Sequence, residues 1–283
     1  MKVLEDLNRR LDATRWPDEI GDDWTYGTDR AYLKELVRYW RRDFDWSAAQ
    51  ARLNAFDQTT ILELTDVARR FQDDLETQAV VLAGAADAFS AGIDLKDSAT
   101  WEDLDDVALR DRSYRGVRLC QAWEDMPQIT VAAMEGLSVG AGCAIALACD
   151  WRVLAADAYL YVPEVKIGLN LQWGALPRLI TLVGPARAKR IVLLCERMGA
   201  EQALDWGLID EIADPGGAVA VARGLAETAA SMPAATTRMV KEAVNATANA
   251  LHRASAFADA DQSSLTRGFT DAAAARERFA GGG

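Results

Sequence analysis

Two segments of the sequence carry residues whose types and spacing suit the stabilisation of a developing negative charge. The first, GAGCAIALACD at residues 140–150, opens with glycines, and a backbone without side chains lets its N–H groups approach a ligand closely. The second, VPEVKIGL at residues 162–169, supplies one carboxylic acid, Glu164. Ala144 stands in the first segment where a partner carboxylate could have been. The two segments together predict a polarising site with a single acid or base.

Glu164 has apolar neighbours in the sequence, with Val162, Val165 and Ile167 close by and Pro163 directly before it. Burial among such side chains disfavours the charged form of a carboxyl group, so the pKa of Glu164 is expected to be raised. A carboxyl group that titrates nearer to neutral pH is well suited to proton transfer.

The chain divides into three regions that differ in composition and hydrophobic pattern, and these regions must position the residues above. Residues 1–56 are rich in Trp, Arg and Asp and predict a helical and irregular arm that wraps the rest of the chain. Residues 57–200 predict an α/β core, because amphipathic helical segments alternate there with the short apolar runs QAVVLAG, ITVAAME and DWRVLAADAYLYV. Such alternation favours parallel strands. Residues 201–283 predict a C-terminal helical region.

The charge balance and the N-terminal sequence argue against several classes of protein. The net charge of −12 would repel a phosphate backbone, so a nucleic-acid partner is not expected. No apolar run is long enough to span a bilayer, and the start MKVLEDLNRRLD lacks the apolar core of a secretory signal. We therefore expect a cytoplasmic protein with no membrane partner.

Cysteine and histidine usage gives no sign of a metal site. The four cysteines have apolar neighbours, form no CxxC pair and are expected to be reduced core thiols: Cys120, Cys143, Cys149 and Cys195. The single histidine, His252, lies in a helical pattern and is expected on a helix face. One histidine nearly excludes a zinc site and disfavours a Ser–His–Asp triad. Neither GxGxxG after a strand nor GxxxxGK[ST] is present, so these patterns give no support for nucleotide binding.

From residue 53 to residue 279 the sequence resembles the crotonase superfamily, the enoyl-CoA hydratase/isomerase family. The resemblance is carried by motifs in the order typical of that family: LNAFDQTTILEL, AFSAGIDLK, GAGCAIALACD, VPEVKIGL, WGALPRLITLVGPARAKRIVLL and AEQALDWGLIDEI. It implies an α/β fold with a crotonase-like ββα spiral core, a C-terminal helical region and a CoA thioester as substrate. No permanently bound cofactor is implied.

Residues 1–56 are instead similar to the N-terminal segment of microsomal-type epoxide hydrolases, which brings no catalytic residue. Epoxide hydrolysis would need a nucleophile on a strand-to-helix turn and a well-placed histidine, and neither is visible after residue 56. The arm takes the place of two strands that the enoyl-CoA hydratase/isomerase family carries ahead of the LNAF position. CoA binding at that end of the site is therefore left open.

The resemblance assigns roles to residues that match the family motifs. The backbone N–H groups of Ile93 and Ala141 would form an oxyanion hole, with Gly92 and Gly140 permitting close approach. Such preorganised donors are each worth about 3–4 kcal/mol in related reactions. Lys96 matches a position near the CoA phosphates, although a solvated lysine after a turn is an equal alternative.

Glu164 would be the catalytic acid and base. Ala144 stands where hydratases of the family carry a second glutamate, and relatives with only the first include Δ3,Δ2-enoyl-CoA isomerases. Double-bond isomerisation in fatty acid metabolism is therefore the favoured prediction. Gln172 and Trp173 lie where hydratases are Gly-rich, and they would narrow the acyl site or exclude water, unless Trp173 simply belongs to the core.

Several alternatives stay open at this point. They are enoyl-CoA hydration, another enolate reaction such as thioester hydrolysis or decarboxylation, and a non-catalytic subunit of the same fold. Relatives of this family assemble as trimers or pairs of trimers, so the resemblance implies a homotrimer or hexamer.

Overall fold

The computed structural model describes residues 52–85, 87–95, 97 and 104–281 of the 283-residue chain. The predicted N-terminal arm lies outside these residues except for positions 52–56, and so does Lys96. Among the helices that the structure describes, none combines the length and the apolar composition needed to cross a bilayer.

A four-stranded parallel sheet stands at the centre of the fold, with strand order β1-β2-β4-β7. Its strands are β1 (Ala79–Ala83), β2 (Ile129–Met134), β4 (Trp151–Ala155) and β7 (Glu211–Ala213). Every residue of β2 is buried, as expected for a parallel strand covered on both faces. The strands predicted in QAVVLAG, ITVAAME and the first half of DWRVLAADAYLYV are thereby confirmed.

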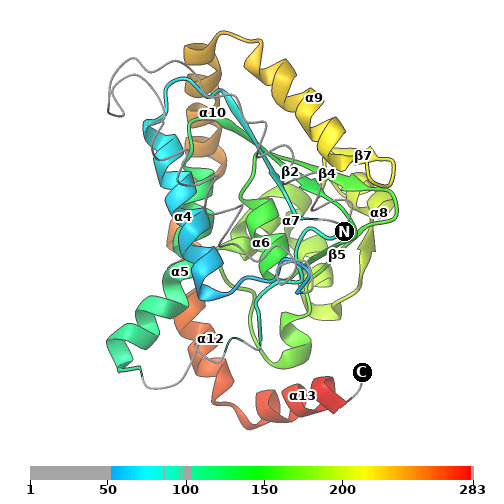
Figure 1. Ribbon diagram of the computed structural model, residues 1–283. Coiled ribbons are helices and arrows are strands. Elements are labelled where there is room, and N and C mark those ends of the chain that lie inside the picture. The colour runs from blue at the N-terminus through cyan, green and yellow to red at the C-terminus, as the bar shows by residue number, and fades with distance from the viewer. Residues whose placement is uncertain (1–51, 86, 96, 98–103, 282–283) are drawn as a thin grey trace, which may run out of the picture.

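Helix α9 (Ala218–Ala230) covers one face of this sheet (Figure 1). The helix presents small side chains at helical spacing, and they pack against the sheet: Ala218, Ala222, Ala226 and Ala229. The strands contribute Val131 and Val153 to the same cluster. Alanine gives this helix a thin face, so it can lie close to the strands.

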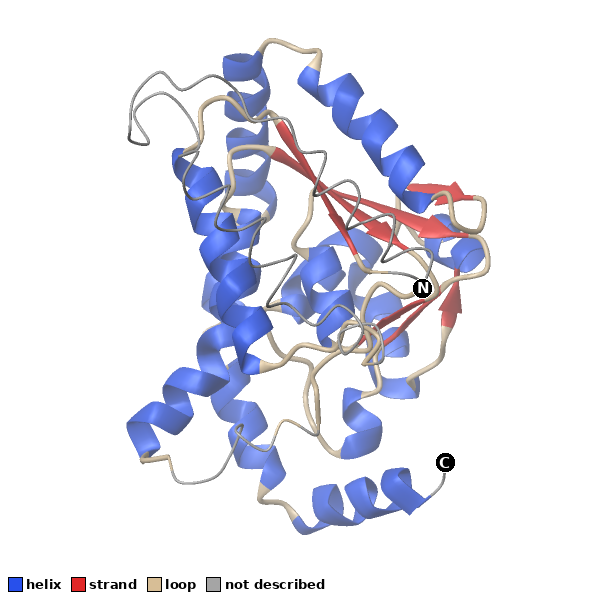
Figure 2. Ribbon diagram, viewed as in Figure 1, coloured by secondary structure: helices blue, strands red, loops and turns tan. Residues whose placement is uncertain are grey.

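Three further helices lie on the other side of the sheet and enclose the main core (Figure 2). They are α4 (Gln58–Asp73), α5 (Asp106–Glu124) and α6 (Ala141–Leu147). Asp57 is the N-cap of α4, and its carboxylate accepts a hydrogen bond from the N–H of Thr60 at 2.8 Å. Trp123 and Leu119 of α5 are completely or almost completely buried in this core.

A second sheet of three short strands has the order β3-β5-β6 and positions the two segments that carry the chemistry. Its strands are β3 (Leu137–Val139), β5 (Tyr159–Tyr161) and β6 (Met198–Gly199). β3 leads into α6, and β5 leads into the 3-10 helix η3 (Glu164–Ile167). Because β3 and β5 pair in parallel, both segments leave the sheet at the same edge.

The sequence did not predict β3, β6 or β7, and β7 lies within residues 201–283, which we expected to be helical. Two or three residues are too few to show the alternation that marks a strand. Their pairing partners lie far away in the chain, β7 with β4 and β6 with β5, so only tertiary contacts define them.

The predicted helices after η3 are present. They are α7 (Ala175–Leu194, broken at Gly184), α8 (Ala200–Asp205), α10 (Ala234–Ala248), α11 (His252–Ala256), α12 (Asp259–Arg267) and α13 (Thr270–Gly281). α12 packs against α5, and α13 packs against η3 of the same chain. α12 and α13 lie together at one end of the molecule (Figure 1), and α13 contacts the segment that begins with Glu164.

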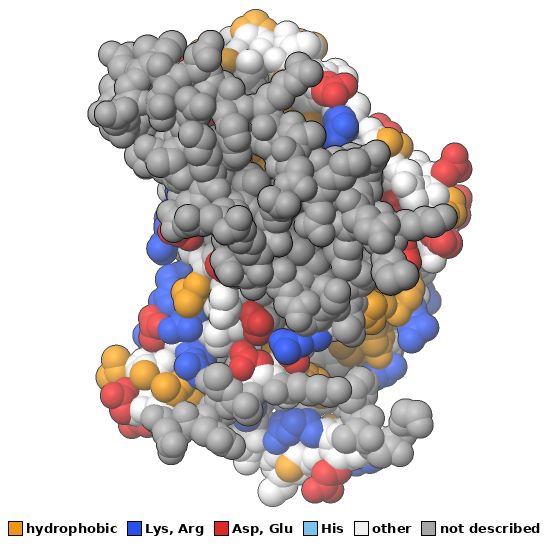
Figure 3. Space-filling model, in the orientation of Figure 1, with side chains coloured by type: hydrophobic (Ala, Val, Ile, Leu, Met, Phe, Trp, Pro, Cys, Tyr) orange, Lys and Arg blue, Asp and Glu red, His pale blue; other side chains and the backbone are white. Residues whose placement is uncertain are grey.

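The described surface carries charges of both signs. Figure 3 shows acidic and basic side chains next to one another on the visible described part of this face.

Candidate active site

The N-terminus of α6 is shaped by Gly140, which has φ 51° and ψ −108°. This conformation strongly favours glycine, since a Cβ would be strained there. The N–H of Gly140 donates to the carbonyl oxygen of Tyr161 at 2.9 Å, and the N–H of Val139 donates to the carbonyl oxygen of Ser90 at 2.9 Å. The segment before α6 is thus held between the end of β5 and the loop around residue 90.

The second backbone segment of the site, around Ile93, runs beside Gly140 and Ala141. Gly92 has φ 89°, and a Cβ at that position would lie 2.7 Å from the carbonyl oxygen of Val139 and 3.5 Å from the nitrogen of Ala141. The close approach therefore requires glycine. On its other side this segment forms a β-bridge to Phe56, whose N–H donates to the Gly92 carbonyl oxygen at 2.7 Å.

The N–H groups of Ile93 and Ala141 have no acceptor in the part of the chain that the structure describes. Buried backbone N–H groups are almost always paired, so two neighbouring unpaired donors are chemically available to an external acceptor.

Ser90 organises this region and was not singled out from the sequence. It is 1% exposed, and its Oγ donates to the carbonyl oxygen of Asn54 at 2.9 Å and accepts from the N–H of Gly92 at 3.1 Å. A Cβ at Gly142 would lie 2.9 Å from the carbonyl oxygen of Ser90. The serine before the glycine in AFSAGIDLK was the available signal, since short hydroxyl side chains often bond to nearby backbone groups.

Glu164 begins η3 and faces the start of α6. A Cβ at Gly140 would lie 2.7 Å from Glu164 Oε1, so the carboxyl group stands directly beside the glycine that precedes Ala141. Glu164 Oε2 is buried and has no hydrogen-bond partner among the described residues. Desolvation by burial raises the pKa of Glu164 from 4.5 to about 7.

The apolar surroundings of Glu164 differ in part from those expected. Val162 is buried, but Val165 is 38% exposed, because the 3-10 turn points it toward solvent. A distant helix contacts the end of η3, because a Cβ at Gly168 would overlap Ala272 of α13.

The raised pKa of Glu164 predicts a pH-dependent stability. The folded state holds this proton more tightly than the unfolded state, so the free energy of unfolding is expected to fall as pH rises from about 4.5 to about 7. The loss attributable to Glu164 should be at most about 3 kcal/mol. Urea unfolding of the wild type and of Glu164→Gln at pH 5 and pH 8 measures this loss. The variant should gain stability relative to the wild type at pH 8, and an equal difference at both pH values would contradict a desolvated carboxyl group.

The structure shows the contacts or burial of three further residues that the sequence singled out. Ala144 is 2% exposed and lies on α6. The Gln172 amide donates to Ser263 Oγ of α12. The Trp173 ring is buried and stands edge-on to the Phe56 ring, with 5.6 Å between ring centroids.

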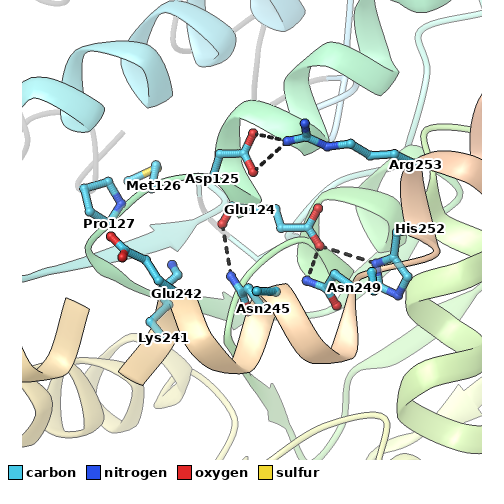
Figure 4. Close-up of a pocket in the computed structure, with 12 residues that line it drawn as sticks. Glu124, Asp125, Met126, Pro127, Lys241, Glu242, Asn245, Asn249, His252 and Arg253 are labelled. Carbon is cyan, nitrogen blue, oxygen red and sulfur yellow. Dashed lines mark hydrogen bonds and ion pairs between the residues drawn. The ribbon is translucent and has the colours of Figure 1, made fainter. Parts of the chain in front are cut away.

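His252 lies in a cluster away from Glu164. Its Nδ1 is 3.5 Å from Oε1 of Glu124, which also accepts a hydrogen bond from Asn249 at 2.6 Å (Figure 4). Its Nε2 is 2.9 Å from Thr181 Oγ1, and burial lowers its pKa. His252 is the first residue of α11, in keeping with the helical pattern, and its side chain is only 7% exposed.

The cysteines are distributed through the core of the described chain. All four cysteines are buried free thiols, as expected. Burial raises the pKa of three of them, Cys120, Cys143 and Cys149, to about 12. Within the described residues, no group of three or more His, Cys, Asp or Glu side chains could hold a metal ion.

Comparison with protein families shows what class of protein this fold and site define. The family model "Enoyl-CoA hydratase/isomerase" matches residues 49–279, which is most of the chain, and the chain belongs to this family. It is an enzyme of the enoyl-CoA hydratase/isomerase type. The model "Epoxide hydrolase N terminus" matches residues 1–82, so the two matches overlap across α4 and most of β1.

Particular relatives agree with this assignment. The chain is 29% identical over 194 residues to the short-chain-enoyl-CoA hydratase of Clostridium acetobutylicum, covering 68% of this chain and 73% of the relative. It is 32% identical to a probable enoyl-CoA hydratase of Mycobacterium tuberculosis, with the same two coverages. A solved structure of an enoyl-CoA hydratase from Mycobacterium avium subsp. paratuberculosis superposes with a TM-score of 0.72 at 26% identity, covering 81% of this chain and 88% of the other. The crotonase-like fold expected from the sequence is therefore confirmed.

Proposed function

We propose that this enzyme moves the double bond of an enoyl-CoA thioester from the 3 position to the 2 position, with Glu164 as its single acid and base. The observation that carries this proposal is the position of Glu164. Its Oε1 stands beside Gly140, and its Oε2 is buried with no partner in the described part of the chain. Ala144 leaves no second carboxylate at the other key position.

The first step is removal of a proton from C2 of the thioester. The thioester carbonyl oxygen would accept hydrogen bonds from the N–H groups of Ile93 and Ala141, which have no acceptor among the described residues. As the C–H bond breaks, its electron pair moves toward the carbonyl oxygen to give an enolate. Two fixed donors stabilise that charge more than they stabilise the neutral carbonyl group, which lowers the barrier.

In the second step the same carboxyl group returns the proton to C4, and the electrons of the dienolate form the double bond between C2 and C3. Atoms balance without water, because one proton leaves C2 and one arrives at C4. A pKa of about 7 suits Glu164 to both halves of this transfer near neutral pH.

Two further positions favour isomerisation over hydration. Addition of water needs a group that orients the water as well as a group that delivers a proton to C2. Ala144 can do neither, and the amide of Gln172 is held by Ser263. Trp173 places a bulky apolar ring in the stretch where hydratases are Gly-rich.

Hydration is the second candidate, and the names of relatives favour it. The relatives from Clostridium acetobutylicum and Mycobacterium tuberculosis are both called enoyl-CoA hydratases. In this alternative Glu164 would act with a water held by backbone groups.

The proposal also covers CoA binding and assembly. Lys96 would contact the CoA phosphates, and the enzyme would need no permanently bound cofactor. A homotrimer or hexamer is also proposed, and an apolar groove of about 640 Å³ beside α10 offers a surface for it. Val240 and Val244, both more than half exposed, line this groove.

Incubation of the protein with 3-enoyl-CoA in ¹⁸O-labelled water tests the reaction type. We expect 2-enoyl-CoA of unchanged mass as the first product, identified by mass spectrometry and by the absorbance of the conjugated thioester. A labelled 3-hydroxyacyl-CoA formed directly from 2-enoyl-CoA would replace isomerisation with hydration. Absence of any product, with no binding of CoA or butyryl-CoA in a calorimetric titration, would indicate a non-catalytic subunit.

A further inference from the structure

Trp173 has a backbone conformation that a bulky residue rarely adopts. Its φ is 63°, and the next residue, Gly174, has φ 65°. A non-glycine residue in this left-handed region costs on the order of 1 kcal/mol, and such outliers concentrate at functional sites. The two consecutive left-handed residues turn the chain sharply at the start of α7 and direct the indole ring toward α5.

The ring of Trp173 fits against a glycine inside a helix. Gly116 lies in the middle of α5, where glycine costs roughly 1 kcal/mol relative to alanine. A Cβ at Gly116 would overlap the indole atoms of Trp173. The positive φ of Trp173 and the glycine inside α5 each cost stability, and together they let the indole ring pack against α5.

The turn at Trp173 is also held from outside by buried charges. Arg178 donates to the carbonyl oxygens of Trp173 at 3.1 Å and Gly174 at 3.0 Å, and it pairs with Glu124 at 2.6 Å. Asp259 of α12 accepts from the N–H of Gly174 at 2.7 Å. Glu124 is fixed in turn by the cluster that contains Asn249 and His252 (Figure 4). These contacts make the ring position rigid.

The ring of Trp173 is linked to the proposed oxyanion hole through a single residue, Phe56. It packs edge-on against Phe56, and the backbone of Phe56 is bridged to Ile93. Phe56, Trp173, Ala141 and Ala144 belong to one apolar cluster. An alkyl chain attached to a thioester carbonyl at Ile93 and Ala141 would gain free energy along apolar side chains, and the Phe56–Trp173 pair would supply them.

We propose that Trp173 closes the acyl end of the site and is a specificity-determining residue, so that the enzyme accepts short, butyryl-sized acyl groups and rejects octanoyl-sized ones. This inference rests on the proposed function, because it assumes that a CoA thioester binds at Ile93, Ala141 and Glu164. It adds the substrate class: short-chain acyl-CoA. Gly116 is the matching position on α5 that gives the ring its room.

Calorimetric titration with saturated acyl-CoA esters tests the inference without relying on turnover, since butyryl-CoA and octanoyl-CoA have no double bond to move. In the wild type, we expect octanoyl-CoA to bind at least about tenfold more weakly than butyryl-CoA. In Trp173→Gly, octanoyl-CoA should bind as tightly as butyryl-CoA or more tightly, because buried methylene groups each add affinity. Glycine is chosen because it tolerates the positive φ.

Two further variants keep the result interpretable. Trp206→Ala removes a tryptophan that lies under Arg187 and Arg190 on α7, and it should leave the ratio of the two dissociation constants unchanged. Trp173→Phe keeps an aromatic ring and should give an intermediate ratio even if Trp173→Gly fails to fold.

The outcomes separate this inference from the proposed function. Equal binding of both esters to the wild type overturns the inference alone, and so does an unchanged ratio in a folded Trp173 variant. Failure of the wild type to bind either CoA or butyryl-CoA overturns the proposed function, and the inference with it.

Discussion

Glu164→Gln is expected to lower kcat for 3-enoyl-CoA by about a thousandfold, with little change in the affinity for butyryl-CoA. The amide keeps the size of the side chain but can neither take nor return a proton. General acid–base groups contribute about 10² to 10⁴ in rate, and here one group would serve both transfers. Stopped-flow absorbance of the conjugated product measures kcat, and calorimetry measures affinity.

The control for this variant is Glu227→Gln, which makes the same chemical change at an exposed position on α9. It should keep wild-type turnover. Turnover of Glu164→Gln within about tenfold of the wild type would contradict the proposed role of Glu164. Loss of a general acid–base group is expected to lower the rate by at least about 10².

Gly92→Ala is expected to lower kcat by about 10² to 10³, the loss typical of one oxyanion donor. The new Cβ would lie 2.7 Å from the carbonyl oxygen of Val139, and φ is 89° at this residue. The backbone must therefore shift, and the N–H of Ile93 would leave its proposed place in the oxyanion hole. Turnover of 3-enoyl-CoA gives the effect, and circular dichroism shows whether the variant is folded.

Gly224→Ala is the matched control, since Gly224 lies inside α9 with no atom near the position of a new Cβ. This change should leave kcat unaltered and should stabilise the fold by up to about 1 kcal/mol. A folded Gly92→Ala variant with wild-type turnover would show that the Ile93 N–H is not needed, and the oxyanion assignment would have to be withdrawn.

Much of the central architecture could be predicted from the sequence, because local patterns encode it. The apolar run ITVAAME became β2, and the glycine-led segment at Ala141 became α6. Glu164 and Gly140, 24 positions apart in the sequence, were expected in one site, and the structure brings them together at 2.7 Å between Oε1 and the Cβ position of the glycine. The residue types at these positions, glycine before α6 and glutamate after proline, were enough to indicate the site.

Features that depend on distant contacts could not be predicted in this way. β7 forms only because β4 offers it a partner, and Val165 faces solvent because of the 3-10 turn. The cover of η3 by Ala272 and the fit of Trp173 onto Gly116 join segments far apart in the chain. Neither contact produces a periodic hydrophobic pattern in the sequence, because each involves only two residues, one of them a glycine.

The central claim is that two backbone N–H groups and one carboxyl group form an enolate from a thioester. Exchange of the C2 hydrogens of 3-enoyl-CoA with deuterated water, followed by NMR, tests it most directly. We expect deuterium at C2 or C4 with the wild-type protein and none above background with Glu164→Gln. Equal exchange, or equal formation of 2-enoyl-CoA, by the wild type and by Glu164→Gln would contradict proton transfer through Glu164.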